Sequence, residues 1–593
     1  MLRSPLVWVV GVVLTWFVVA LLVWPNANLL LQTFAPDGTP TLRAVEKLAS
    51  SERAMTSLAH SFLLAAVLSV TVNVVGVFIV LVTRYYDIRG ARFLFLGYAT
   101  TLVYGGIVLA AGWRFVYGAD GIVTGLLQSV LPGLPEDWFS GFPAVVVVMT
   151  FATTTNHLLF VSGALGRVDH QTIEAARAMG ASEWTILRRI VLPMMRPVLF
   201  AVTILTFLGG LGALSAPQVL GGRDFQTVAP MILTFASSPG SRDIAALLAL
   251  VLGVATVLLL MVLTRVEKGG TYFSISKVSS ALVKQRIANP VLNVAVHVLA
   301  YALCAVYLVP VVVIVLYSFV DSRSIGASEL SLGAMSLDNY ARVLGDGRTL
   351  RPFLVSVVYA GLTAVISVVG LLFVARILVR WRNPLTAAVE YLLHIPWILP
   401  TTLIALGLII SFDHPSPLVG WQVLTGTAVI LLIAYVIGRI PFTLRLLKAA
   451  FAGVDGRLEE AASLMGARSL TVMRRILLPS VLPTALAIGA LTFNSLLDDY
   501  DTAVFLAHPL YQPLGLAIKA ATEGDANLDG RADTFVYTVL LMIITGATMY
   551  LVYGRGVRGR PRRRRVDGPA TTGPATTGPS TAGSSARLVR SGR

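Results

Sequence analysis

The chain has 593 residues, of which 56% are hydrophobic and only 13% are charged. Soluble globular chains carry about 25% charged residues, so the composition excludes a soluble globular protein of this length. The formal net charge of +16 does not indicate nucleic-acid binding, because the basic residues lie in loops between apolar runs rather than on one basic face. We therefore predict an all-α polytopic membrane protein.

About twelve apolar runs follow along the chain, each close to the roughly 20 residues that a helix needs to cross a bilayer. They fall at 6–32, 57–82, 93–111, 141–163, 197–216, 243–264, 291–319, 353–379, 386–411, 423–444, 480–504 and 535–553. Basic residues gather in alternate loops, and the positive-inside rule then places those loops and both termini in the cytoplasm.

The predicted organisation has four parts. Residues 1–264 form a first half with six spans, 265–290 a cytoplasmic linker, 291–553 a second half with six spans, and 554–593 a basic, disordered cytoplasmic tail. The tail is rich in Arg, Pro and Gly, a composition that cannot build an apolar core. Because each half has an even number of spans, we expect the two halves to enter the membrane in the same orientation.

An internal repeat supports this division. The segment EAARAMGASEWTILRRIVLPMMRP begins at Glu174, and EAASLMGARSLTVMRRILLPSVLP begins at Glu460, 286 positions later. Both copies lie in a predicted cytoplasmic loop before the fifth span of their half. Duplicated units of this kind are typical of transporters, whose pathway lies between the repeats.

The repeated segment predicts a short helix, a turn and a second helix. Asp169 and Asp455 are good N-cap residues, and Glu174 and Glu460 lie near the helix start, where negative charge is favoured. The alanines that follow give a thin, strongly helical shaft: Ala175, Ala176, Ala461 and Ala462. Two glycines suit the C-terminal ends of these helices, where the chain turns: Gly180 and Gly466.

Both copies follow the pattern Glu-Ala-Ala, three residues, Gly, nine residues, Ile, any residue, Leu-Pro. This pattern resembles the signature of the permease subunits of binding-protein-dependent ABC importers, and the resemblance covers nearly the whole chain. It implies that the first short helix of each copy is a coupling helix that docks on an ATPase subunit. The docking residues it implies are Glu174, Ala175, Ala176, Gly180, Glu460, Ala461, Ala462 and Gly466.

The resemblance also implies partners and a location. Two docking segments imply two ABC ATPase subunits, identical or not, together with an extracytoplasmic solute-binding protein and the lipid bilayer of a bacterial inner or plasma membrane. The chain has no Gly-Lys pair, so it lacks the phosphate-binding Walker loop. We therefore expect it to be a permease subunit rather than an enzyme, with ATP bound on separate subunits and no cofactor on this chain.

A proton-coupled secondary transporter of the major facilitator type is the alternative, since that class also has twelve spans in two halves. The loop 83–92, with the sequence TRYYDIRGAR, is superficially similar to the loop signature of that class. Thr83 replaces its first glycine and the basic residue is displaced, so we interpret these arginines as ordinary positive-inside charges.

Ionisable groups inside spans are costly and mark candidate pathways. The candidates are Asn494, Asp498, Asp499 and Asp501, which have no acidic counterparts 286 positions earlier. The segment is similar to the Ser-x-Asp-Asp stretch of spermidine/putrescine permeases, whereas fusion of both halves is typical of ferric-iron and thiamine members. We expect a cationic solute of one of these three classes; a wet helix end or a gate is the alternative.

A loop with the sequence DANLDGRAD resembles part of an EF-hand calcium loop. Its candidate ligands are Asp525, Asn527, Asp529 and Asp533, but Val536 stands where the bidentate Glu belongs. An ordinary turn requires the same residue types. Calcium binding in this extracytoplasmic loop is therefore one hypothesis and a plain turn the other.

Overall fold

The computed structural model describes residues 5–36, 38–269, 282–326, 333, 335–381, 383–523 and 528–554. Helices make up most of the described residues, which contain three isolated bridges and no extended strand. Within the described part of the chain, eleven helices are long and apolar enough to cross a membrane, or twelve if one bent pair is counted as a single span. The predicted all-α membrane fold is confirmed.

The elements of the first half are α1 (Pro5–Phe17), η1 (Val18–Val23), α2 (Trp24–Phe34), α3 (Arg43–Ser50), α4 (Glu52–Val80), η2 (Leu81–Tyr85), α5 (Ala91–Tyr98), η3 (Ala99–Leu102), α6 (Gly106–Tyr117), α7 (Ile122–Val130), α8 (Gly141–Asn156), η4 (His157–Val161), α9 (Ser162–Leu165), α10 (His170–Ala178), α11 (Glu183–Ile186), η5 (Leu187–Val191), α12 (Leu192–Leu211), α13 (Ser215–Leu220), α14 (Val228–Ala236) and α15 (Arg242–Gly269).

The second half comprises α16 (Pro290–Tyr317), α17 (Ser322–Gly326), α18 (Asp338–Gly345), α19 (Gly347–Arg380), α20 (Pro384–Ile398), α21 (Thr401–Phe412), α22 (Ala428–Ala452), α23 (Gly456–Leu464), α24 (Ser469–Val472), η9 (Met473–Leu477), α25 (Leu478–Asn494), α26 (Ala503–Leu506), α27 (Leu514–Ala521), α28 (Leu528–Met549) and η10 (Tyr550–Gly554). The elements from α10 to α12 and from α23 to α25 begin 286 positions apart. Part of the predicted linker, 270–281, and the tail from 555 onward lie outside the described residues.

The third span of each half is interrupted, which corrects the expectation of unbroken helices at 93–111 and 386–411. In the first half, α5 and η3 end before a Gly-Gly pair, and Gly106 has a left-handed φ of +51°. In the second half, α20 and α21 meet at 105°. Pro400 explains this bend, because it disfavours helical backbone at Leu399, which adopts an extended conformation.

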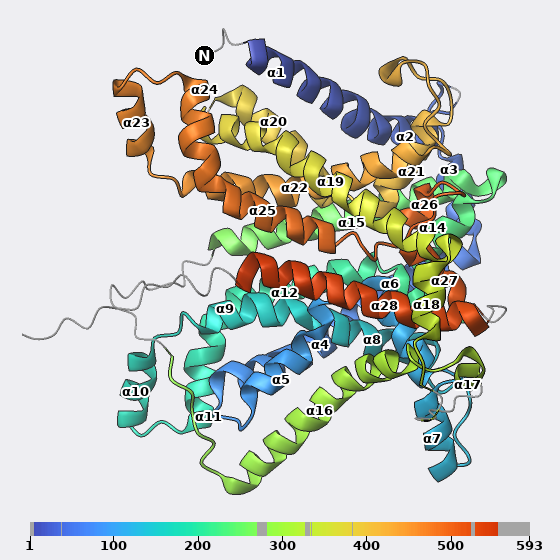
Figure 1. The fold of residues 1–593 in the computed structure, drawn as a ribbon, viewed down its shortest axis with the longest axis vertical. Helices are drawn as coiled ribbons and strands as arrows, with labels where there is room; N and C mark the ends of the chain where they lie inside the picture. The colour runs from blue at the N-terminus through green and yellow to red at the C-terminus, as the bar shows by residue number, and fades with distance from the viewer. Residues whose placement is uncertain are drawn as a thin grey trace, which may run out of the picture.

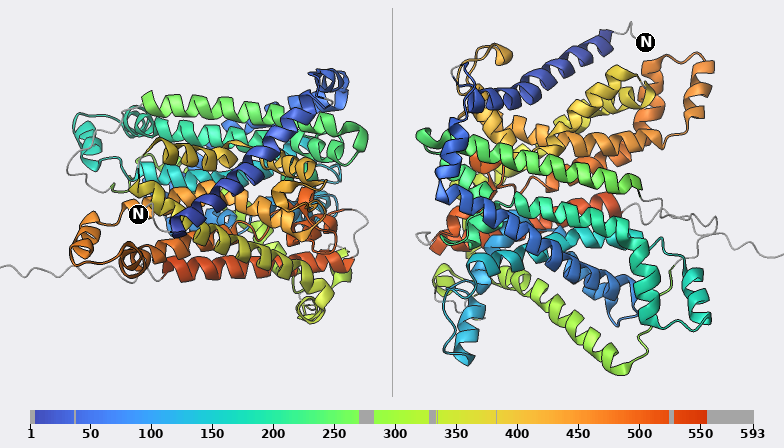
Figure 2. Two further views of the ribbon diagram at one scale, coloured as in Figure 1. Left: turned by 90° about the horizontal axis from the view of Figure 1, so that it is seen from above. Right: turned by 180° about the vertical axis from the view of Figure 1, so that it is seen from behind.

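The two sequence halves interlock. The first span of each half packs against the interrupted third span of the other: α2 lies along α21, and α16 lies along α5 and α6. Figures 1 and 2 show α1 and α16 on opposite outer sides of the bundle. Interhelical hydrogen bonds support this exchange, from Asn28 to Ser411 at 3.0 Å and from the Tyr98 hydroxyl to the Ala300 carbonyl at 2.7 Å.

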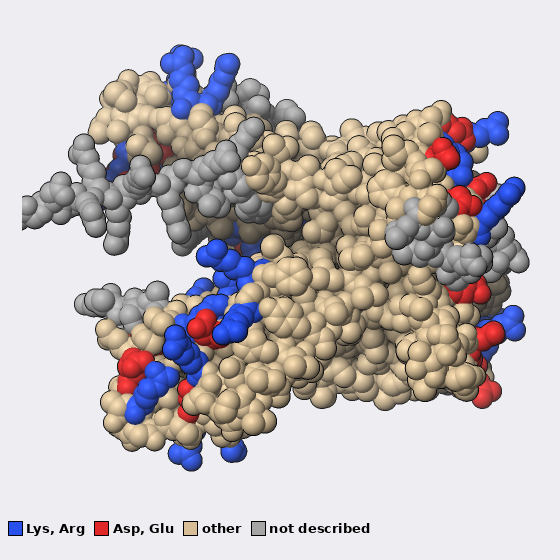
Figure 3. All heavy atoms as spheres, turned by 60° about the horizontal axis from the view of Figure 1, so that its bottom comes forward, with Lys and Arg blue, Asp and Glu red and all other residues tan. Residues whose placement is uncertain are grey.

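Charged side chains lie mainly at the two ends of the bundle. Figure 3 shows Lys, Arg, Asp and Glu at both ends of the visible face, with a broad zone of other residues between them. An uncharged belt of this kind matches the apolar core of a bilayer. The helices α10 and α23 lie at one end, which we call the docking end, and α1 begins and η10 ends there too (Figure 1).

Candidate functional site

The docking segments start as their sequences predict. The Asp169 carboxylate accepts the backbone N–H of Gln171 at 3.2 Å, and the Asp455 carboxylate accepts that of Arg457 at 3.0 Å. Each Asp therefore satisfies one of the free N–H groups at the start of α10 or α23. The predicted N-caps are confirmed.

The helix ends also have the same geometry in both copies. Gly180 and Gly466 have φ values of +79° and +78°, which L-residues with a side chain rarely adopt. The N–H of the next residue then reaches back to a helix carbonyl, from Ala181 to Ala176 and from Ala467 to Ala462, at 3.0 Å in each copy. This Schellman turn directs the chain into α11 and α24.

The two alanines of each docking helix have different environments. Ala176 and Ala462 are buried against the bundle, whereas Ala175 and Ala461 are exposed beside the exposed Glu174 and Glu460. Of each alanine pair, only the first residue is thus available to a partner. The outer surface also carries two methionines that the predicted docking residues do not include, Met179 and Met465, which are 81% and 82% exposed. Met465 follows Met179 by 286 positions, so both methionines occupy the same place in the repeat, and this repetition was the signal by which the sequence could have indicated them.

The two docking helices are fixed to the bundle by different contacts. Ile173 is fully buried in an apolar cluster beneath α10. Its counterpart, Glu459, instead forms an ion pair with Arg376 of α19. In addition, Arg177 of α10 donates a hydrogen bond to Gln285 of the linker, which is buried against the end of η2. Both helices are therefore held firmly, although the sequence motif does not include these contacts.

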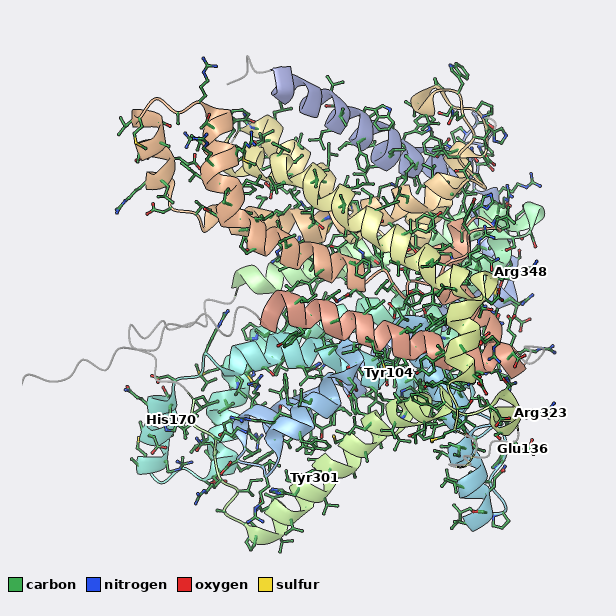
Figure 4. The ribbon with its side chains drawn as sticks, viewed as in Figure 1. Tyr104, Glu136, His170, Tyr301, Arg323 and Arg348 are labelled. Atoms are coloured by element: carbon green, nitrogen blue, oxygen red, sulfur yellow. The ribbon has the colours of Figure 1, made fainter. Side chains whose placement is uncertain are left out.

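A cavity of about 380 Å³ lies between the two halves and brings all four predicted pathway residues together. Its walls come from the break in the third span of the first half and from the segment after α25. The pathway residues that line it are Asn494, Asp498, Asp499 and Asp501. In Figure 4, Tyr104, which also lines the cavity, lies between His170 of the docking end and Arg323 and Arg348 at the other end.

Two of the carboxylates bond across the interface between the halves. Asp498 accepts the backbone N–H of Gly105 at 3.3 Å, and Asp501 accepts a hydrogen bond from the Ser215 hydroxyl. Ser215 and Asp501 are separated by 286 positions, so they occupy equivalent places in the two repeats. Equivalent residues touch only near the axis that relates the repeats, and the cavity therefore lies close to that axis.

The cavity wall has more negative than positive charge. Asp499 accepts backbone N–H groups of the following turn, from Thr502 at 3.2 Å and from Ala503 at 3.3 Å. Arg439 of α22 donates to the Ser495 carbonyl at 3.1 Å and lies close enough to Asp499 to interact with its charge. Among the described residues here, three carboxylates thus face one guanidinium. Arg439 was not among the predicted pathway residues, although an arginine inside a predicted span was a usable signal.

The proposed calcium ligands are only partly described. Asp525 and Asn527 lie outside the described residues, and Asp529 and Asp533 lie in the first turns of α28. Arg342 of α18 pairs with both, at 3.2 Å from Asp529 and 2.8 Å from Asp533. The described residues contain no group of three or more His, Cys, Asp or Glu side chains that could hold a metal ion. Calcium binding stays a prediction.

Comparison with known proteins identifies relatives along most of the chain. A probable ABC transporter permease protein of Sinorhizobium fredii is 40% identical over 545 residues, which cover 92% of this chain and 95% of the relative. A ferric transport system permease protein of Actinobacillus pleuropneumoniae is 22% identical over 492 residues, covering 82% of this chain and 69% of the relative.

A spermidine/putrescine transport system permease protein of Haemophilus influenzae is 28% identical over 211 residues, covering 35% of this chain and 77% of the relative. The family described as binding-protein-dependent transport system inner membrane component matches twice, at residues 4–268 and 366–560. These matches do not favour the major facilitator alternative. The chain belongs to this family of ABC importer permeases and carries two copies of the permease unit in one polypeptide.

Proposed function

We propose that this permease carries a small cationic solute, of the ferric iron, polyamine or thiamine class, which an extracytoplasmic binding protein delivers. The observation that carries the proposal is the acid-lined cavity at the axis between the halves. Substrate sites of duplicated transporters lie at the interface of the repeats, and three carboxylates against one guanidinium favour a cation there. Relatives named for ferric and for spermidine/putrescine transport are consistent with this charge.

The docking segments are the proposed contacts with two ATPase subunits. In this proposal those subunits, rather than this chain, bind ATP. Both segments lie at the docking end, as the helices α10 and α23 show in Figure 1. Glu174 of α10 and Glu460 of α23 are among the proposed contact residues. Each segment leads without a break into a spanning helix. One of these helices, α25, ends at Asn494 in the cavity wall, and the other, α12, ends shortly before Ser215.

This connection supplies a mechanism for coupling. When the ATPases move the docking helices, the firm contacts at Ile173 and Glu459 transmit the displacement to the bundle. The helices α12 and α25 then carry it to opposite walls of the same cavity. Because the halves meet there, a small rotation of one against the other opens the cavity toward either end. The chain itself thus binds and conducts solute, and its partners supply the energy.

The distribution of basic residues supports a proposal for which end of the protein faces the cytoplasm. The docking end carries the basic loops, so we place it, with both chain termini, in the cytoplasm of a bacterial cell whose inner or plasma membrane holds the protein. The solute then enters from the end that bears α7, α17 and α18.

Uptake by cells that express the complete transporter tests the substrate proposal. We expect Asp498→Asn and Asp501→Asn each to reduce uptake of the transported cation at least 10-fold while the ATPase subunits still co-purify with the permease. Asp224→Asn is the matched control, because Asp224 is exposed outside the cavity. Labelled ferric iron, putrescine and thiamine are compared in parallel. Unchanged uptake in both cavity variants overturns the proposed pathway.

A second experiment tests the docking contacts separately. Glu174→Arg combined with Glu460→Arg reverses the charge on the exposed surface of both docking helices. We expect the ATPases no longer to co-purify, whereas the permease itself stays folded by thermal melting. Retention of the ATPases together with normal uptake contradicts the docking proposal.

A further inference from the structure

A second, larger cavity of about 980 Å³ lies at the docking end of the first half. The end of η2, the start of α5 and the short helix α9 form its walls, and the linker closes one side through Leu282 and Lys284. This cavity is separate from the acid-lined cavity, with which it shares no lining residue.

Among the described residues, three basic side chains line this cavity and no acidic side chain does. They are Arg84, Arg92 and Lys284, all exposed, and none forms an ion pair with a carboxylate of the described residues. The Arg84 guanidinium lies 4.6 Å from the centre of the Phe95 ring, which holds it at the cavity wall. The first turn of α5 adds the partial positive charge of a helix N-terminus. The cavity therefore favours an anion.

The remaining walls are apolar and open sideways. Leu158 and Leu165 are buried beneath the cavity, whereas Leu96 and Leu159, which also line it, are 68% and 53% exposed on the outside of the bundle. Exposed leucines next to spanning helices face the acyl chains of a bilayer. An anion that enters from this side can thus keep an apolar tail in the membrane.

The equivalent cavity in the second half provides an internal comparison. It has a volume of about 670 Å³, and Lys448 occupies the position equivalent to Ser162 of the first cavity. Lys448 forms an ion pair with Glu390, and both side chains line the second cavity. Lys448 and Glu390 therefore neutralise each other in the second cavity, whereas no carboxylate of the described residues pairs with the three cations of the first cavity.

We propose that the cavity at Arg84, Arg92 and Lys284 binds the phosphate headgroup of an anionic phospholipid from the cytoplasmic leaflet. Arginine forks pair well with phosphate oxygens, and basic pockets between spanning helices on the cytoplasmic side suit such headgroups. The acyl chains lie along Leu96 and Leu159. Because Lys284 adjoins Gln285, which bonds the docking helix α10, the lipid stabilises the contact between the linker and one docking segment.

Lipid binding to the purified, delipidated permease tests the proposal without any ATPase or solute. Native mass spectrometry counts phosphatidylglycerol molecules retained by the intact chain during a titration. We expect one saturable site for phosphatidylglycerol and none of similar affinity for phosphatidylcholine. Glycerol 3-phosphate in a parallel titration distinguishes a free phosphate from a lipid. Equal retention of the two lipids, or equally tight binding of glycerol 3-phosphate, overturns the proposal.

Matched variants locate the site. Each cation near an anionic lipid strengthens binding roughly 5-fold, so Arg84→Gln with Arg92→Gln weakens binding roughly 25-fold. The control is Arg474→Gln with Arg475→Gln, which removes two exposed cations at the docking end outside either cavity. We expect wild-type binding in the control and unchanged thermal melting in both. Equal affinity of the two double variants refutes the location.

Discussion

The ion pair between Arg376 and Glu459 is expected to hold the second docking helix on the bundle. Both side chains are largely buried, with 19% and 16% of their surface exposed, and the adjacent Ala462 and Leu378 pack in one apolar cluster. Removing one partner of a buried pair costs roughly 3–5 kcal/mol, because the other charge stays buried without compensation. Since some exposure remains, we expect Glu459→Gln to lower the free energy of unfolding by about 3 kcal/mol.

The first half of the chain indicates which substitutions can restore the free energy of unfolding that Glu459→Gln removes. Its buried Ile173 occupies the position equivalent to Glu459. Replacing a buried ion pair by apolar residues of similar volume is often neutral, so Arg376→Leu combined with Glu459→Ile should restore most of the stability. By contrast, Glu523→Gln breaks a pair in which Glu523 is 60% exposed and should cost less than about 1 kcal/mol.

Chemical denaturation of the purified permease measures these differences, and transport-coupled ATP hydrolysis in the assembled transporter measures their effect on coupling. The single variants Arg376→Gln and Glu459→Gln should each lose stability, and the double variant should lose little more than either one. If both single variants cost less than about 0.5 kcal/mol and their effects add, the two side chains do not interact and the reasoning is wrong.

Three further predictions concern local structure. Gly180→Ala and Gly466→Ala force a side chain into left-handed backbone, so each should cost about 1–2 kcal/mol by chemical denaturation, whereas Gly456→Ala, with φ outside that region, should not. Hydrogen bonding by the Arg348 backbone N–H lowers the pKa of Asp346, the N-cap of α19. The stabilisation that the Asp346 carboxylate gives to the folded state should therefore be complete above the ordinary Asp pKa of about 3.9 and disappear as the pH falls through the lowered pKa of Asp346. The difference in Tm between the wild type and Asp346→Ala should vanish at that low pH. If the 525–533 loop binds calcium, millimolar calcium should raise the Tm, and Asp529→Asn should abolish that rise; no heat of binding by calorimetry contradicts the site.

The sequence by itself determined the features that depend on neighbouring residues. Apolar runs predicted a membrane protein with about twelve spans, and the repeated segment predicted two capped helices ending at Gly180 and Gly466. These predictions succeed because hydrophobic length, N-caps and left-handed turns are local properties of the chain. The interruptions of the third spans were also predictable from the sequence, since Pro400 and the Gly105-Gly106 pair are local helix-breaking signals.

Only the tertiary structure decided which distant residues meet. The exchange of first spans places Asn28 against Ser411, and the contact of Ser215 with Asp501 places the acidic segment at the axis between the halves. The basic cavity likewise joins Arg84 to Lys284, 200 positions apart. Apolar periodicity determines that a helix is buried, but many packings bury the same apolar area. Which polar groups then face one another depends on how the helices pack, and this decided both cavities of this protein.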